Sequence, residues 1–176
     1  MITTIIDKTV IDGVNYYPHS NGGGLVAETA TVSETAYIGL DAVVGGHAQV
    51  TGLVIIADYA SVYDNAIISD EAMVIGDAMV IGDARVSGHV IVSGHVIVSG
   101  HAEISGKARI FDKARIFDKA KISGEVRVFD KAEISGEAEI SGHAQVDGHI
   151  SGSTIIFDNI DGNIKASGKA IVTDNT

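Results

Sequence analysis

Residues 84–106 read ARVSGHVIVSGHVIVSGHAEISG, and the same six-residue phrase continues on both sides of this stretch. Alanine, or valine in its place, stands at every sixth position from Ala30 to Ala144. Valine or isoleucine follows two positions later, and glycine or aspartate is the commonest residue two positions after that. A short fixed period is the signature of a repeat architecture. The repeating unit is therefore A-x-[VI]-x-[GD]-x.

The unit predicts stacked strands. Apolar and polar positions alternate, which is the two-residue period of a β-strand, but Gly or Asp ends each strand after about four residues. No two-residue hairpin loops separate these strands, which argues against a meander of hairpins. They can stack as rungs of a parallel β-solenoid, each rung pairing with the next at about 4.8 Å. In such a tube the Ala side chains lie near the corners, and Val or Ile fills the interior.

The unit resembles the hexapeptide repeat of the left-handed β-helices, in which three hexads make one triangular coil of about eighteen residues. It is most similar to the A-x-V-x-G-N-A-x-V variety of phages and enterobacteria, some members of which are described as acyltransferases. The segment HSNGGGLVAETATVSETAYIG (19–39) is also similar to the lead-in of that group. The resemblance covers residues 22–146 and implies an all-β, single-stranded left-handed parallel β-helix. It also implies a phage-derived protein and a homo-oligomer, with a trimer favoured.

Three segments are expected along the chain. Residues 1–23 form an N-terminal β cap, because Asp12-Gly13 between short apolar runs is a hairpin signal. Residues 24–149 form the regular β-helix, and residues 150–176 form irregular terminal coils. We place four-residue units at Ile150 and Ile160, where the six-residue period breaks.

Composition narrows the classes of function. The chain has 176 residues and no cysteine, which predicts one domain and excludes disulfides and thiolate metal sites. No signal peptide is recognisable, and no apolar run approaches the roughly 18 residues that span a membrane. We therefore expect a cytoplasmic protein, or one of the host cytoplasm or virion if it is phage-encoded. The net charge of −11 makes nucleic acid and anionic membranes unfavourable partners.

The candidate binding surface is basic and aromatic. The hexads ARIFDK (108–113) and VRVFDK (126–131) are eighteen residues apart, so the repeat stacks like charge on like charge, which is unfavourable unless something compensates. Either the neighbouring aspartates compensate, or an anion, a partner carboxylate or a base stacked on Phe does. Phe or Tyr precedes Asp in five hexads, so Asp there is alternatively turn chemistry. The predicted ligand- or partner-binding residues are Arg109, Phe111, Lys113, Arg115, Phe117, Arg127, Phe129 and Lys131.

Large apolar residues also occupy outward positions on consecutive rungs. A contiguous exposed apolar area of more than a few hundred square ångströms marks an interface. We therefore predict a homo-oligomer, with a foreign protein partner as the alternative. The predicted interface residues are Ile55, Met73, Ile75, Met79, Ile81, Ile91 and Ile97.

The sequence offers little for catalysis. His89, His95 and His101 take the same slot in consecutive hexads, hence three different corners more than about 10 Å apart, too far to share a metal ion. No insertion between residues 30 and 149 could shape a pocket, and we predict neither metal nor cofactor. His19 is the only histidine off the repeat and is the alternative candidate for a general base.

We therefore expect a non-catalytic structural or binding protein that uses an oligomeric solenoid as a rod or an interaction surface. One alternative is an acyltransferase-like enzyme with an acyl-CoA or nucleotide-sugar site between subunits. Another is an acidic polyanion mimic that inhibits a host protein, because residues 1–84 carry one Lys against eleven acids. The basic residues are concentrated in residues 85–131, with nine bases against five acids.

Overall fold

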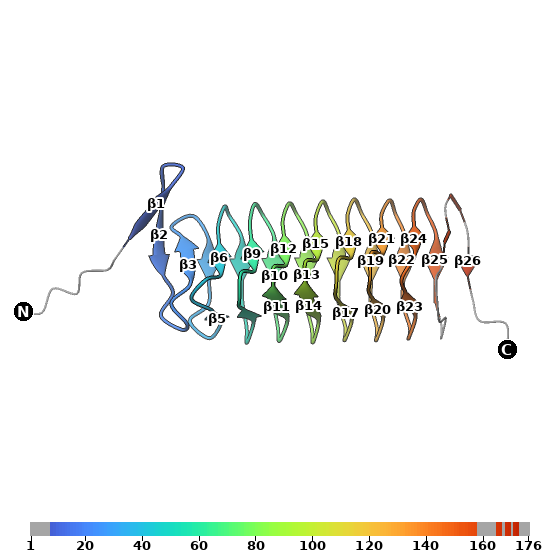
Figure 1. The fold of residues 1–176 in the computed structure, drawn as a ribbon, viewed down its shortest axis with the longest axis horizontal. Helices are drawn as coiled ribbons and strands as arrows, with labels where there is room; N and C mark the ends of the chain where they lie inside the picture. Colours follow the sequence, from blue (N-terminus) through green and yellow to red (C-terminus); the bar gives the residue numbers. More distant parts are fainter. Residues whose placement is uncertain (1–7, 158–164, 167, 170, 173–176) are drawn as a thin grey trace, which may run out of the picture.

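A computed structural model describes residues 8–157 together with 165–166, 168–169 and 171–172. In this part of the chain the protein is all-β, with no helix, and its coils stack into a rod (Figure 1). Consequently no helix of the described residues is long and apolar enough to cross a membrane.

Three sheets form the sides of the rod, and we call them walls A, B and C. Wall A contains β3 (Leu25–Ala27), β6 (Val43–Val44), β9 (Ser61–Val62), β12 (Met79–Val80), β15 (Ile97–Val98), β18 (Arg115–Ile116), β21 (Glu133–Ile134) and β24 (His149–Ile150), and is extended by β1 (Thr9–Ile11) and β2 (Val14–Pro18). Wall B contains β4 (Thr31–Val32), β7 (Gln49–Val50), β10 (Ile67–Ile68), β13 (Arg85–Val86), β16 (Glu103–Ile104), β19 (Lys121–Ile122), β22 (Glu139–Ile140), β25 (Ile155–Ile156) and β26 (Ile171–Val172). Wall C contains β5 (Tyr37–Ile38), β8 (Ile55–Ile56), β11 (Met73–Gly76), β14 (Ile91–Gly94), β17 (Arg109–Ile110), β20 (Arg127–Val128) and β23 (Gln145–Val146).

The register of the walls gives the length of a coil. Ile55 pairs with Met73, and Met73 pairs with Ile91, both in parallel. Residues eighteen positions apart are therefore neighbours on one wall, and three hexads complete one coil. This confirms the parallel β-solenoid that the repeat predicts.

Most strands are two residues long, shorter than the four expected, yet the backbone ladder extends beyond them. The amide of Ser87 donates to the carbonyl of Ile104 at 2.9 Å, and the amide of His89 donates to that of Gly106 at 2.8 Å, although both donors lie outside β13. Rung-to-rung hydrogen bonds therefore continue into the corners, and each corner repeats the backbone of the one before it.

The interior consists of the two apolar positions of each hexad. From Ala36 to Val146 every Ala or Val in the first slot, and every Val or Ile in the third, is at most 1% exposed. Full burial of a Val or Ile side chain stabilises a fold by about 1.5–3 kcal/mol. The repeated Val and Ile positions therefore supply the main stabilisation of the rod, and the outer positions are free to differ.

The turns explain why Gly and Asp share one slot. This position adopts a positive φ, as at Gly94 (85°) and Asp112 (63°), a conformation open to Gly and, among other residues, best tolerated by Asn and Asp. The carboxylate of Asp112 also accepts the backbone N–H of Asp130 at 3.1 Å. Among the described residues, the equivalent backbone N–H of the next rung is also accepted by the carboxylates of Asp58, Asp64, Asp70 and Asp118. Turn chemistry therefore accounts for Asp in this slot.

The N-terminal hairpin β1–β2 turns at Asp12 and Gly13, both at positive φ, and β2 pairs antiparallel with β3. The loop that follows covers the edge of β5, where Gly24 donates to the carbonyl of Ile38 at 2.9 Å. A Cβ on Gly24 would lie 2.2 Å from the carbonyl oxygen of Gly39, so this glycine permits the close contact. The first coil is thus covered on two of its walls.

One coil near the other end is shorter. Glu133 pairs with His149, sixteen residues further on, and the Glu133 amide donates to the carbonyl of Gly148. Gly148 therefore occupies the alanine slot, and the four-residue unit is 144–147, one unit earlier than the expected unit at Ile150. The second expected unit, at Ile160, lies outside the described residues.

Candidate binding surface

From β5 to β20, wall C carries three outward columns, each with one residue per rung, and β23 adds Gln145 to the first of them. The first outer column, at the start of each strand, is Tyr37, Ile55, Met73, Ile91, Arg109 and Arg127. The second outer column, two residues later, is Gly39, Ala57, Ile75, Ser93, Phe111 and Phe129. The corner column, at the junction with wall A, is Asp41, Tyr59, Asp77, His95, Lys113 and Lys131.

The rungs of β17 and β20 bring together six of the eight predicted binding residues. Arg109 and Arg127 are directly in register. The half-buried rings of Phe111 and Phe129 stack with centroids 5.6 Å apart and planes 13° apart. Each rung therefore presents an arginine, an aromatic ring and a lysine in sequence. We call the six residues Arg109, Phe111, Lys113, Arg127, Phe129 and Lys131 the basic patch.

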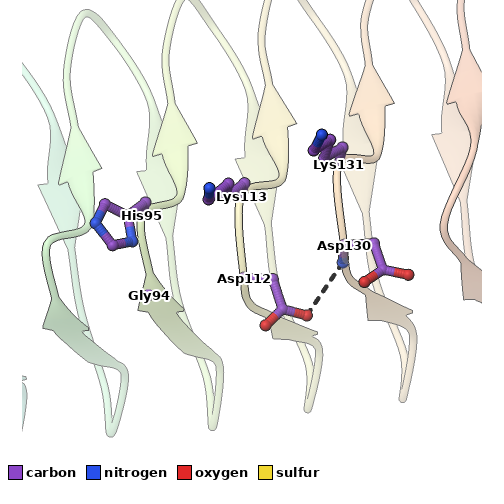
Figure 2. Close-up of a pocket in the computed structure, with 6 residues that line it drawn as sticks. All are labelled: Gly94, His95, Asp112, Lys113, Asp130 and Lys131. Atoms are coloured by element: carbon purple, nitrogen blue, oxygen red, sulfur yellow. Dashed lines mark hydrogen bonds between the residues drawn. The ribbon is translucent and has the colours of Figure 1, made fainter.

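Figure 2 shows the corner of this patch, where Lys113 and Lys131 lie on neighbouring rungs beside His95. A shallow hollow of about 380 Å³ is lined by Gly94, His95, Asp112, Lys113, Asp130 and Lys131. The carboxylate of Asp112 points to the backbone N–H of Asp130 (Figure 2). It is thus engaged in the turn, and no ion pair to either lysine is formed.

Cations on the other two walls have acidic neighbours. Each of the following lies one rung from a carboxylate: Lys107 from Glu125 at 3.0 Å, Arg115 from Glu133 at 3.7 Å, Lys119 from Glu137 at 3.2 Å and Lys121 from Glu139 at 3.9 Å. Arg85 lies in register with Glu103. The hydrogen bond and positive charge of Lys107, followed by the charges of His143 and Arg109, lower the pKa of Glu125, so this carboxylate is stabilised in its charged form.

The four cations of the basic patch differ from these cations in their ion pairing. Within the described residues, no ion pair joins Arg109, Lys113, Arg127 or Lys131 to a carboxylate. Like charges in register repel each other, and guanidinium groups bind carboxylates and phosphates in a bidentate manner. The basic patch is therefore suited to an anionic group supplied from outside the chain.

The other two predicted binding residues lie elsewhere. Arg115 opens β18 on wall A, and Phe117 follows on the same wall, beyond the corner column. Arg115 is paired with Glu133, whereas the patch arginines are not. The structure therefore separates these two residues from the basic patch.

The predicted interface residues also divide between two walls. Ile55, Met73, Ile75 and Ile91 lie on wall C, where the apolar rungs adjoin the basic patch. The remaining three, Met79, Ile81 and Ile97, lie on wall A. The predicted interface does not include Tyr37, Asp41 and Tyr59, which share the columns of wall C. Each lies eighteen residues before another residue of its column, namely Ile55, Tyr59 and Asp77 respectively, and this spacing could have placed them on wall C.

The histidines lie at exposed corners, where they contact carboxylates one rung away. His89 contacts Glu71 at 3.1 Å, His95 contacts Asp77 at 2.8 Å and His101 contacts Asp83 at 3.4 Å, each pair at a different corner. Among the described residues, no group of three or more potential ligands could hold a metal ion.

His19 belongs to the N-terminal loop. Its ring nitrogen Nδ1 accepts the backbone N–H of Asn21 at 3.3 Å, and its own backbone pairs with Gly23 and Gly24. These contacts shape the loop that covers β5.

On wall A, burial and the neighbouring Tyr16 raise the pKa of Tyr63.

Fold and surface together define the class of protein, a parallel β-solenoid whose three walls share one interior and differ in outer chemistry. No protein-family model matches the chain, and no match is found among curated proteins. Function must therefore be argued from the walls themselves.

Proposed function

We propose that this protein is a non-catalytic binding or structural protein, a homo-oligomeric rod that acts through the outer surface of wall C. One observation carries the proposal. Wall C presents Ile55, Met73 and Ile91 on consecutive rungs, and these lead directly into arginines that form no ion pair with a carboxylate among the described residues. An apolar strip bordered by charged residues is the composition of an interface core with its rim.

The shape of the surface supports binding over catalysis. The hollows along the corners are shallow and open, and every corner from Gly46 to Gly142 turns through one residue at positive φ. Catalytic sites need groups that converge in a cleft. The phage origin that the resemblance implies belongs to this proposal and rests on the resemblance alone.

The polyanion-mimic alternative is less well supported. Several acids of the first half, namely Asp58, Asp64 and Asp70, use a carboxylate oxygen to accept a backbone amide of the next rung. Those groups have a structural role in the turns. Their charges also lie at different corners, and do not form a single anionic column.

Measurement of the mass in solution tests the proposal. We expect sedimentation equilibrium at 5–100 μM, a range that brackets the micromolar affinity of modest interfaces, to show a homo-oligomer. Ile91→Glu on wall C should dissociate it, because a charge would enter the apolar strip. Ile67→Glu on wall B occupies the equivalent outward position and should leave the mass unchanged.

A monomeric wild-type protein throughout that range would contradict the oligomer, as would equal effects of the two variants. The enzyme alternative has its own test. A rise in melting temperature with coenzyme A that Arg109→Ala abolishes would favour an acyltransferase-like function over the one proposed.

A further inference from the structure

The side chains along the second outer column of wall C are complementary in size to the same column read in the opposite order. Read from β5 to β20, its residues are Gly39, Ala57, Ile75, Ser93, Phe111 and Phe129. When the order is reversed, each larger side chain meets a smaller one. These facing pairs are Phe129 with Gly39, Phe111 with Ala57, and Ile75 with Ser93.

The corner column has a charge pattern with the same property. Its order is Asp41, Tyr59, Asp77, His95, Lys113 and Lys131. On reversal, Lys131 faces Asp41, and His95 faces Asp77. Lys113 then faces Tyr59, a ring that is 70% exposed and can receive a cation on its face.

The first outer column completes the match. In the same reversed register, Met73 faces Ile91, and Arg127 faces Tyr37, another exposed aromatic ring. Arg109 faces Ile55, against which its aliphatic stem can pack. All three columns thus agree on one register.

We propose that wall C is the interface of an antiparallel homodimer, in which a second copy of this chain occupies the apolar strip and the basic patch. The two-fold axis lies in the plane between the two facing walls, parallel to their strands, and passes between β11 and β14, so that β5 to β20 overlap and β23 lies beyond them (Figure 1). Such an axis turns the rod end over end, so every column faces itself in reverse order. The interface is isologous and closed.

A parallel dimer built on the same wall is disfavoured by charge. It would place rung against the same rung and bring the basic patches of both copies to one end. It would also place the corner column against the opposite edge of the wall, where Lys113 would meet Lys107 and Asp77 would meet Glu71, two like-charge pairs against the single opposite-charge pair of Lys131 with Glu125. Like charges across an interface oppose association, so the antiparallel arrangement is preferred.

The size of the wall sets the expected strength. Six rungs at about 4.8 Å extend over about 29 Å, and four residues at about 3.3 Å give a width of about 13 Å. Such an outline is small beside the roughly 800 Å² that each partner buries in a standard interface. We therefore expect a reversible dimer whose population depends on concentration in the micromolar range.

The inference rests on the proposed function, because it requires that wall C joins copies of the chain. The native chain has no cysteine, so single introduced cysteines report the arrangement directly. Asp41→Cys and Lys131→Cys are prepared separately and mixed under oxidising conditions. We expect a disulfide-linked dimer in the mixture and little in either sample alone, because residues 41 and 131 face each other only between antiparallel copies.

The matched control is the pair His47→Cys and Glu137→Cys, which is also five rungs apart but lies at the corner beyond wall A and should not cross-link. A charge exchange provides a second measurement. Lys131→Asp alone should weaken dimerisation about tenfold, and adding Asp41→Lys to the same chain should restore it. The two residues are five rungs apart within one chain, so the rescue must act between copies.

The outcomes separate the two proposals. A wild-type monomer at 100 μM overturns the proposed oligomer, and the inference with it. An oligomer that fails to cross-link through residues 41 and 131, and shows no charge rescue, overturns the antiparallel wall C interface alone. A trimer in solution, which the resemblance implies, would have the same consequence. Circular dichroism of each variant verifies that the solenoid is retained.

Discussion

Walls A and B differ from wall C in the charges they carry over one common interior. Between residues 107 and 121, Arg115 on wall A, Lys121 on wall B, and Lys107 and Lys119 at the two corners of wall B lie 3.0–3.9 Å from a carboxylate one rung away. On wall C the cations of the same coils lie in register with each other. Since the buried residues are equivalent on all three walls, folding does not require this difference. It therefore indicates what the outer surface is used for.

The largest expected effect concerns the shared interior. Ile110, Ile116 and Ile122 point inward from walls C, A and B in consecutive hexads, and each is at most 1% exposed. Replacing any one by Ala should lower the free energy of unfolding by about 2–5 kcal/mol. Urea unfolding followed by circular dichroism measures this change. Losses of unfolding free energy that differ strongly between the three variants would contradict an equivalent interior behind the three walls.

The next effect compares two turns on wall C. Asp112 accepts the amide of the next rung, but within the described residues no amide donates to the carboxylate of Asp130, because the coil shortens beyond it. Asp112→Gly keeps the positive φ and removes one hydrogen bond, so it should cost about 1 kcal/mol of unfolding free energy. Asp130→Gly should cost less, and equal losses would show that the bond contributes nothing.

A smaller effect tests the charge difference itself. Arg115→Gln on wall A removes the pair with Glu133 and should lower stability by about 0.2–1 kcal/mol, the range for exposed pairs. Arg109→Gln on wall C removes a like-charge neighbour and should leave stability unchanged or raise it. Urea unfolding at low ionic strength, below the dimerisation range, distinguishes them. A larger loss from Arg109→Gln would show that wall C is compensated within the chain.

The smallest effect concerns the one wall that joins the N-terminal hairpin. Burial, and then Tyr16, raise the pKa of Tyr63 above its usual value, so the folded state favours the neutral hydroxyl. This contribution is complete below the unfolded-state pKa of about 10 and is lost as pH rises through the higher folded-state pKa. Tyr63→Phe should therefore reduce the loss of stability between pH 9 and 11, which urea unfolding at the two pH values measures.

The interior was predictable because its two positions obey one rule in every hexad. Alanine fits beside a corner and Val or Ile fills the bore, so the spacing of these residues alone predicts the coil. The pairing of Arg109 with Arg127 and of Phe111 with Phe129 followed from the same eighteen-residue step.

The exterior was less predictable, because a short distance in sequence does not keep two residues on one wall. Arg115 and Phe117 follow Lys113 closely, yet the corner places them on wall A. The shortened unit was placed one step late, because Gly148 replaces alanine and Ile150 suits either apolar slot. Nor does the repeat disclose which cations find acidic neighbours, since that depends on residues a full coil away.

The three-hexad coil also constrains how such a gene can change. Inserting or deleting eighteen residues would lengthen or shorten the rod by one layer and leave every downstream side chain facing the direction it had. Inserting a single hexad would preserve the buried positions but rotate all later residues by a third of a turn. The outer residues of each wall would then continue on a different wall beyond the insertion. Selection on an exposed face would therefore reject single-hexad changes within it that the fold itself tolerates.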